Sequence, residues 1–193
     1  MARGTLHALL VALLLQAVCM APARGDDDAA WAALRSGGAV IALVRHAQAP
    51  GTGDPPNWRL DDCSTQRNLS ERGRADAQAL GQRLRAARVP VSKVLSSPWC
   101  RCLDTARLMD VGTVQAEPAF SNAFMLNDRR DELAAAGRKL LQAWRGPGVL
   151  VVVTHGSNIA ALTGRSPDSG EVVIVTARAD GALRVEGTIS TSR

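Results

Sequence analysis

The chain has 193 residues, of which 46% are hydrophobic and 21% charged, and its 23 basic and 18 acidic side chains leave a formal charge of +5. The basic residues are spread along the chain without a basic run or interleaved aromatic residues, which argues against a nucleic-acid partner. No linker, low-complexity tract or internal repeat interrupts the sequence, which favours a single domain.

The N-terminus has the layout of a secretory signal, with Arg3, an apolar run at Ala8–Val18 and small residues after it. This run is shorter than the roughly 20 apolar residues that span a bilayer, so no stable membrane anchor is expected. The small residues predict cleavage after Ala23, or as late as Gly25. We therefore predict a signal peptide at 1–23, one domain at 24–193, and a periplasmic or secreted protein.

The remaining chain alternates short apolar runs with segments of helical periodicity. The acidic run at 26–28 is predicted to be a solvated tail. In chain order, the sequence then predicts strand 39–44, a long loop at 48–68, helix 70–88 capped by Ser70, strand 91–96, a helix with Pro98 in its first turn, strand 113–116, helix 131–144, strand 149–154, helix 158–162, and strands 172–177 and 183–188. This order predicts a three-layer α/β fold, with a mostly parallel central sheet, helices on both faces, and an antiparallel edge formed by the last two strands.

Three cysteines follow the predicted cleavage site: Cys63, Cys100 and Cys102. Because cysteines of exported proteins often pair, we expect a disulfide from Cys63 to Cys100 or to Cys102, with the third thiol left free. The sequence does not distinguish the two pairings.

The candidate site residues follow the ends of predicted strands. His46, preceded by Arg45, follows the first strand, and His155 follows the strand at 149–154. Ligands of open α/β sheets bind beyond the carboxyl ends of the strands, so both histidines should reach one rim. Arg101 lies in the first turn of the next helix, and helix N-termini favour anions. The sequence therefore predicts a site for an anion.

These motifs resemble the histidine phosphatase superfamily, in its phosphoglycerate mutase-like branch. The resemblance rests on Arg45-His46, on Arg101 within SSPWCRCLDTA, and on Thr154-His155-Gly156, which occur in the order of that family. The chain resembles in particular the exported members that act on cell-envelope sugar phosphates, through the segments at 62–63, 65–70 and 99–102. The first histidine of the family is normally followed by glycine, whereas this chain has Ala47.

The resemblance implies a metal-independent phosphoric monoester hydrolase that needs no cofactor. Its nucleophile would be His46, which forms a phosphohistidine. Its binding partner would be its substrate, a phosphorylated small molecule or glycan. The physical chemistry agrees, because Arg45 and Arg101 can each bind phosphate oxygens through two N–H groups and His155 can add a donor. Gln66 and Arg67, in the long loop, are further candidates for substrate binding.

The chain departs from the family at the acid that protonates the leaving group. Many members have a glutamate soon after the third strand, where this chain has Asn122. An amide can bind phosphate but cannot give up a proton. Glu117, Asp128 and Asp54 are the candidate proton donors, and the sequence favours none of them.

Three other interpretations are open at this point. The first is a non-catalytic binder of phosphorylated ligands. The second is a protein phosphatase directed at phosphohistidine, since relatives of that kind also lack the glutamate. A zinc site made by the two histidines with Cys100 and Cys102 is the third, and the short C-x-C spacing argues against it.

Overall fold

The computed structural model describes residues 26–191. The predicted signal peptide at 1–23 lies outside the described residues. Within 26–191, every helix is too short or too polar to cross a membrane.

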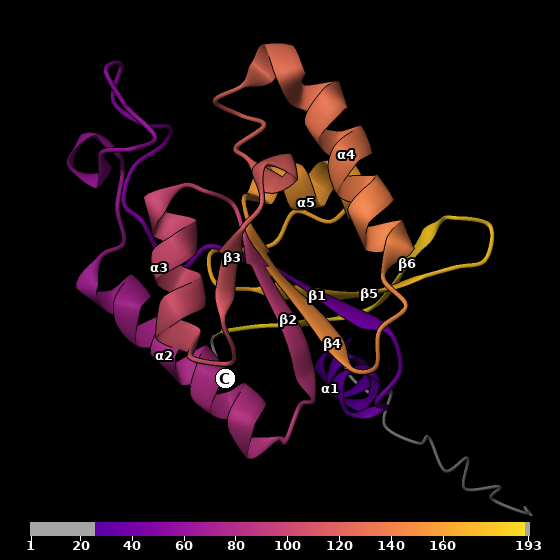
Figure 1. Ribbon diagram of the computed structural model, residues 1–193. Helices are drawn as coiled ribbons and strands as arrows, with labels where there is room; N and C mark the ends of the chain where they lie inside the picture. The colour runs from indigo at the N-terminus through magenta and orange to yellow at the C-terminus, as the bar shows by residue number, and fades with distance from the viewer. Residues whose placement is uncertain (1–25, 192–193) are drawn as a thin grey trace, which may run out of the picture.

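Within residues 26–191, six strands and five α-helices follow one another (Figure 1). The strands are β1 (Val40–Arg45), β2 (Val91–Ser96), β3 (Val114–Ala116), β4 (Val149–Thr154), β5 (Val172–Ala177) and β6 (Leu183–Ile189). The α-helices are α1 (Asp26–Arg35), α2 (Glu71–Ala86), α3 (Cys100–Met109), α4 (Arg130–Ala143) and α5 (Gly156–Thr163). The loops of the described part also contain single-turn 3-10 helices, at η1 (Cys63–Thr65), η2 (Pro118–Phe120) and η3 (Asn127–Arg129).

The strands form one mixed sheet in the order β3-β2-β4-β1-β5-β6. The first four of these strands are parallel, β5 is antiparallel to β1, and β6 is antiparallel to β5. The predicted parallel centre and antiparallel edge are therefore confirmed. Because β1 and β4 are direct neighbours, the two histidine-bearing turns leave the sheet side by side.

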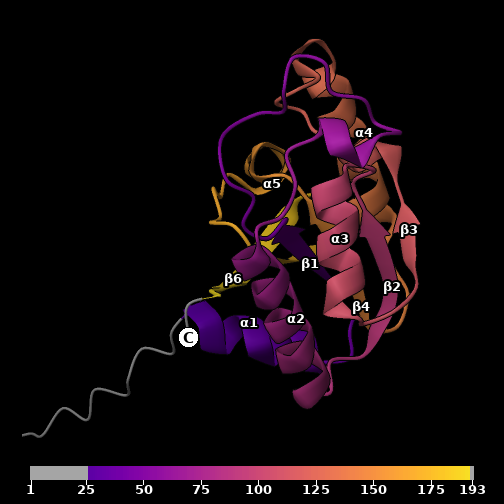
Figure 2. The same cartoon turned by 90° about the vertical axis from the view of Figure 1, so that its left-hand side faces the viewer.

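Successive side chains of each strand point to opposite faces of the sheet, and this divides the core into two layers. In β1, Val40, Ala42 and Val44 pack with the apolar faces of α1, α2 and α3, whereas Ile41 and Leu43 pack with α4 and α5. Both faces of the central strands are therefore covered, which explains their continuous apolar sequences. Figures 1 and 2 show the helices on the two sides of the sheet, and the predicted three-layer architecture is confirmed.

The helix boundaries follow from local chemistry. Ser70 caps α2 by accepting a hydrogen bond from the backbone N–H of Gly73 at 3.0 Å, as predicted. Pro98 lies one residue before the N-cap of α3, which is Trp99, and so outside the first turn in which we predicted it.

The predicted tail at 26–28 is wrong, because these residues begin α1. Acidic residues favour the N-terminus of a helix, where the backbone N–H groups have no partner within the helix. The buried side chains of Ala30 and Leu34 then anchor α1 to the sheet. Helix α1 therefore completes the face of the sheet that α2 and α3 cover.

Candidate active site

The ends of β1 and β4 bring the two histidines together. Arg45 is paired with Thr154 in the parallel register, and the backbone N–H of His46 donates to the carbonyl of Thr154 at 2.9 Å. The next residue along β4 is His155, and the centroids of the two imidazole rings are 5.5 Å apart. Two motifs more than a hundred residues apart thus share one rim of the sheet.

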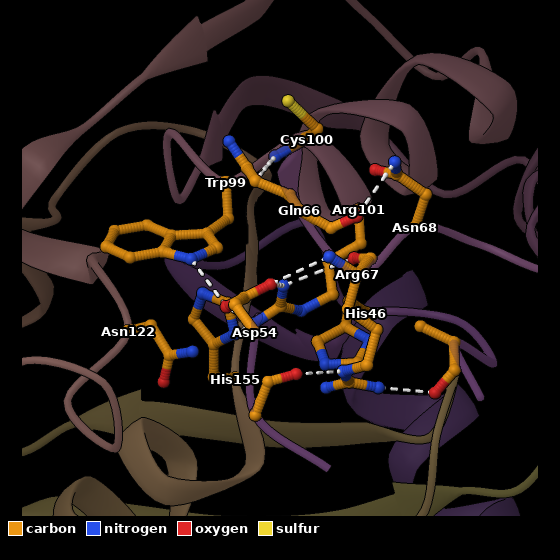
Figure 3. Close-up of polar contacts among 12 residues, drawn as sticks. His46, Asp54, Gln66, Arg67, Asn68, Trp99, Cys100, Arg101, Asn122 and His155 are labelled. Atoms are coloured by element: carbon orange, nitrogen blue, oxygen red, sulfur yellow. Dashed lines mark hydrogen bonds and ion pairs between the residues drawn. The ribbon is translucent and has the colours of Figure 1, made fainter. Parts of the chain in front are cut away.

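A cavity of about 490 Å³ opens at this rim. Segment 51–53 of the long loop and segment 166–168 after α5 contribute to its wall. Figure 3 shows how the polar side chains converge there. We call this cavity the strand-end pocket, and its principal lining residues are Arg45, His46, Arg67, Arg101, Asn122 and His155.

The hydrogen bond of His46 defines its tautomer. Nδ1 lies 2.8 Å from the carbonyl oxygen of Ala47, and because a carbonyl can only accept, Nδ1 carries the proton. Nε2 therefore has a free lone pair. Burial lowers the pKa of His46 to about 3; the Ala47 bond opposes this shift, and the charges of the nearby arginines add to it. The imidazole is thus neutral at physiological pH, which is the form that can attack phosphorus.

Alanine fits the position after His46, where the family normally has glycine. In the described part of the chain, the residues other than glycine with positive φ are Arg88 and Asp110, so the backbone of Ala47 is not in the left-handed region. The N–H of Ala47 donates to Thr105 Oγ1 at 3.0 Å, and this hydroxyl donates to the carbonyl of Arg101 at 2.7 Å. The turn after β1 is therefore tied to helix α3.

His155 has the opposite tautomer. Its Nδ1 faces the NH2 group of Arg101 at 3.5 Å, and a guanidinium can only donate, so the lone pair lies on Nδ1. Nε2–H then donates to Ser97 Oγ at 2.9 Å. Burial lowers the pKa of His155 well below its ordinary value, and His46 and the arginines add to this effect. His155 is thus neutral with both nitrogens occupied, and it has no free N–H for a phosphoryl oxygen in this arrangement.

Arg101 is fully buried and forms a two-point ion pair with Asp54. NH1 and NH2 donate to the two carboxylate oxygens at 2.8 and 3.2 Å (Figure 3). The backbone N–H of Arg67 and the indole of Trp99 also donate to this carboxylate, at 2.9 and 3.1 Å. Burial raises the pKa of Asp54, but Arg101 and the other donors outweigh it and hold the pKa below its usual value. Asp54 is therefore an ionised anchor for Arg101.

Two buried N–H groups of the pocket arginines lack a partner among the described residues. They are Nε of Arg45 and Nε of Arg101. Arg45 is held by a bond from NH1 to the carbonyl of Pro167 at 2.8 Å, and its guanidinium lies against Gly156, where a Cβ would come within 3.3 Å of Nε. An unpaired buried donor costs about 1–3 kcal/mol, so an oxyanion that accepts from both groups would be stabilised here.

The two candidates from the long loop differ. Arg67 lines the pocket, where Nε donates to the carbonyl of Gly53 at 2.8 Å and NH1 to that of Ala49. Gln66 does not line the pocket. Its amide accepts from the N–H of Cys100 at 3.0 Å and donates to two carbonyls of its own loop, so it joins this loop to α3. The predicted substrate contact of Gln66 is therefore replaced by a positioning role.

Asn122 lies in the pocket with a fixed amide orientation. Its Oδ1 accepts from the N–H of Phe124 at 3.1 Å, which leaves Nδ2 as the group that can donate to a ligand. Asn158 of α5 holds this loop, because its side chain bonds to the N–H of Ala123 at 3.2 Å and the carbonyl of Ser121 at 2.8 Å. Asn122 can thus bind an oxyanion but supplies no proton.

None of the three candidate proton donors presents its carboxyl group to the pocket. Asp54 is ionised in its pair with Arg101. Glu117 accepts from the N–H of Ala119 at 3.0 Å and caps η2, outside the pocket lining. Asp128 is exposed on η3, also outside the lining. Inside the pocket, a proton would therefore have to come from another group.

The cysteines form one disulfide, between Cys63 and Cys100, and this resolves the two pairings that the sequence left open. Cys102 is free, and burial raises its pKa to about 12, so it remains a thiol beside His155. The disulfide removes Cys100 as a zinc ligand. Within 26–191 there is no group of three or more His, Cys, Asp or Glu side chains that could hold a metal ion.

The sequence profile of the histidine phosphatase superfamily (branch 1) matches residues 41–125. This segment contains His46, Arg101 and Asn122, and it covers less than half of the chain. Among curated proteins, no sequence matches at a significant level.

Solved structures extend the likeness to most of the chain. The protein histidine phosphatase SixA in complex with tungstate is 16% identical with a TM-score of 0.54, covering 79% of this chain and 97% of its own. A mycobacterial glucosyl-3-phosphoglycerate phosphatase is 19% identical with a TM-score of 0.57, covering 77% and 97%. A phosphoserine phosphatase from Entamoeba histolytica, in complex with 3-phosphoglyceric acid, is 15% identical with a TM-score of 0.55, covering 79% and 98%. The chain has the histidine phosphatase fold.

Within this fold, sequence reasoning found both histidines and three arginines of the pocket, and it missed the two features that complete it. The first is the pairing of Asp54 with Arg101 across 47 residues, for which a lone aspartate in a loop gives no signal. The second is the segment 166–168 beside Arg45. Its Ser-Pro-Asp sequence indicates a turn, but only the packing of β5 against β1 brings that turn to the rim.

Proposed function

We propose that this chain is a phosphatase that hydrolyses a phosphomonoester through a covalent phosphohistidine on His46. The observation that carries the proposal is the free lone pair of His46 Nε2, which results from the 2.8 Å bond between Nδ1 and the carbonyl of Ala47. This nucleophile lies in a pocket lined by three arginines, and a phosphomonoester brings close to two negative charges. The profile match and the fold support the same chemistry.

The reaction requires two steps. Arg45 and Arg101 bind phosphoryl oxygens through their unpaired Nε–H groups, and Arg67 and the amide of Asn122 supply further donors. The lone pair of His46 Nε2 forms a bond to phosphorus while the ester P–O bond breaks. Water then attacks the phosphohistidine and releases inorganic phosphate, which frees Nε2 for another cycle.

The substrate that we favour is a phosphorylated small molecule or glycan of the cell envelope. The pocket volume of about 490 Å³ lies in the range of small-molecule sites, roughly 300–1,000 Å³, and the side chain of Phe124 offers an apolar wall that is 55% exposed. Export is supported by the signal-like N-terminus and by the Cys63–Cys100 disulfide, because disulfides persist in oxidising compartments. One structural relative is a phosphatase of a glucosyl phosphoglycerate, which agrees with a sugar phosphate.

A second candidate is a phosphatase directed at phosphohistidine in proteins. Asn122 stands where many relatives have a glutamate, and an imidazole leaving group needs less help from an acid than an alkoxide does. The likeness to SixA supports this reading as well. The two candidates differ in their substrate, and both depend on His46 as the nucleophile.

Replacement of His46 tests the proposal. His46→Ala removes the nucleophile, and His46→Asn also removes it but keeps an N–H for the carbonyl of Ala47. With p-nitrophenyl phosphate as substrate, we expect both variants to lose kcat/KM by about 10⁴-fold or more. Unimpaired turnover in either variant would overturn the mechanism. Absence of any turnover in the wild-type protein would favour a non-catalytic binder, which calorimetry with inorganic phosphate would then detect.

A further inference from the structure

The strand-end pocket contains a single carboxyl group among the residues that line it in the described part of the chain. This group belongs to Asp168, which lies in the segment between α5 and β5. The other ionisable lining residues are three arginines and two histidines. Both histidines are neutral, and one of them is the proposed nucleophile. Asp168 is therefore the one side chain of this lining that could serve as a carboxylic acid.

Hydrogen bonds on both sides of Asp168 hold its segment against the reacting residues. The carbonyl of Pro167, the residue before it, accepts from Arg45 NH1 at 2.8 Å. The N–H of Gly170, two residues after it, lies 3.1 Å from the carbonyl oxygen of Arg45 and 3.2 Å from that of His46. The backbone of Asp168 itself forms a closed turn with Glu171, through bonds of 2.6 and 3.0 Å. Asp168 is thus part of an ordered turn bonded to the phosphate clamp and to the nucleophile.

The direction of the reaction favours a group at this position. Attack on phosphorus proceeds in line, so the leaving oxygen lies on the side of the phosphorus opposite to the nucleophile. His46 is buried, with 3% of its surface exposed, so the leaving oxygen faces the open side of the pocket. Asp168 is exposed and belongs to the pocket lining, as a group at the open side would be, whereas the Asp54 carboxylate is buried and bound to Arg101.

We propose that Asp168 is the general acid that protonates the leaving oxygen and the general base of the second step, an inference that rests on the proposed function. As the bond from His46 Nε2 to phosphorus forms and the P–O bond breaks, its electron pair goes to the leaving oxygen, which takes the proton of the Asp168 carboxyl. An alcohol departs and Asp168 becomes a carboxylate. In the second step, water attacks phosphorus and gives a proton to Asp168 while the P–N electron pair returns to His46.

The assignment gives this chain a proton donor at a different place from the glutamate of its relatives. In many of those relatives the acid follows the third strand, whereas Asp168 precedes β5 on the opposite side of β1 in the sheet. Asn122, at the position of that glutamate, then serves as an uncharged donor to the phosphoryl group. The amide of Asn122 thus replaces the acid at one wall of the pocket, and the carboxyl group of Asp168 at another wall takes over proton transfer.

The dependence on the leaving group tests this role. An alkoxide must be protonated as it departs, whereas p-nitrophenolate departs without a proton. We expect Asp168→Asn to lower kcat/KM for glycerol 3-phosphate by about 10²-fold or more and to change kcat/KM for p-nitrophenyl phosphate by less than about 3-fold. Asp180→Asn is the matched control, because it makes the same change at an exposed aspartate between β5 and β6, outside the pocket lining, and it should leave both values unchanged.

Two results would overturn the assignment. One is that Asp168→Asn, at an unchanged melting temperature, lowers kcat/KM for both substrates by the same factor or leaves both values unchanged. The other is a wild-type protein that hydrolyses p-nitrophenyl phosphate but no alkyl phosphate, because no acid would then act on the leaving group. Failure of the proposed function is seen separately, as p-nitrophenyl phosphate turnover that persists in His46→Ala.

Discussion

A neutral, buried histidine follows each of the buried parallel strands β1 and β4. The two histidines differ in the groups that surround the imidazole ring. His46 bonds through Nδ1 to a backbone carbonyl and keeps Nε2 free. His155 bonds through Nε2 to Ser97 and turns the lone pair of Nδ1 toward Arg101. The same residue type at equivalent strand ends thus gains a nucleophilic nitrogen in one turn and loses it in the other. The hydrogen-bond partner, more than burial, separates the two roles.

The side chains around His155 form a connected group that includes a buried ion pair. Asp54 binds both terminal nitrogens of Arg101, and Arg101 faces His155. The Cys63–Cys100 disulfide fastens the long loop to the residue before Arg101. We therefore expect substitutions in this group to affect stability and phosphate binding, whereas substitutions at His46 affect the chemical step.

The largest effect on stability is expected from Asp54→Asn. This change leaves the buried Arg101 charge without its carboxylate, and loss of one partner of a buried ion pair costs about 3–5 kcal/mol of unfolding free energy. Urea denaturation measures this loss, and Asp128→Asn is the control because Asp128 is exposed. Equal stability of Asp54→Asn and the wild-type protein would show that the pair does not anchor Arg101.

The next effect concerns His155. His155→Ala removes the ring that faces Arg101, and we expect kcat/KM for p-nitrophenyl phosphate to fall by about 10²–10³-fold. His155→Gln keeps both a donor and an acceptor, so it should recover part of this loss, whereas His46→Asn should recover nothing. If His155→Ala abolished turnover as completely as His46→Ala, the two histidines would not have the separate roles argued above.

The smallest effect is a dependence of stability on pH that both histidines share. His46 has an ordinary pKa of 6.5 when unfolded and about 3 when folded, so between these values the unfolded chain binds a proton that the native chain does not. Stability therefore falls as the pH falls, by on the order of 2 kcal/mol from His46 at pH 5.

The histidines dominate the window from pH 7 to pH 5, because carboxyl groups with a lowered pKa, such as Asp54 and Glu186, affect stability mainly below their ordinary values of 3.8 and 4.5. Unfolding free energies at these two pH values should differ less in His46→Asn than in the wild-type protein. An identical pH dependence in both proteins would contradict a buried, neutral His46.

The sequence predicted the fold well because the signals of this fold are local. Continuous apolar runs such as 149–154 mark strands covered on both faces, and Ser70 marks the start of α2. The strand ends then placed His46 and His155 on one rim, since the carboxyl ends of parallel strands share an edge.

The parts that the sequence did not reveal depend on contacts between distant segments. Nothing local marks Asp54 as the partner of Arg101, and its carboxyl therefore looked like a possible acid. Gln66 looked like a ligand contact because it is polar and lies in a functional loop, but its amide oxygen accepts from the backbone N–H of Cys100, which the disulfide joins to the same loop. Asp168 reaches the pocket only because β5 returns antiparallel to β1.

The covalent intermediate tests the central claim most directly. The wild-type protein is mixed with a phosphomonoester labelled in its phosphoryl group, quenched within milliseconds and digested, and the label is mapped to a peptide. We expect an acid-labile, base-stable label on His46 and none on His155. A label on another residue, or measurable turnover without any label on the protein, would contradict the account.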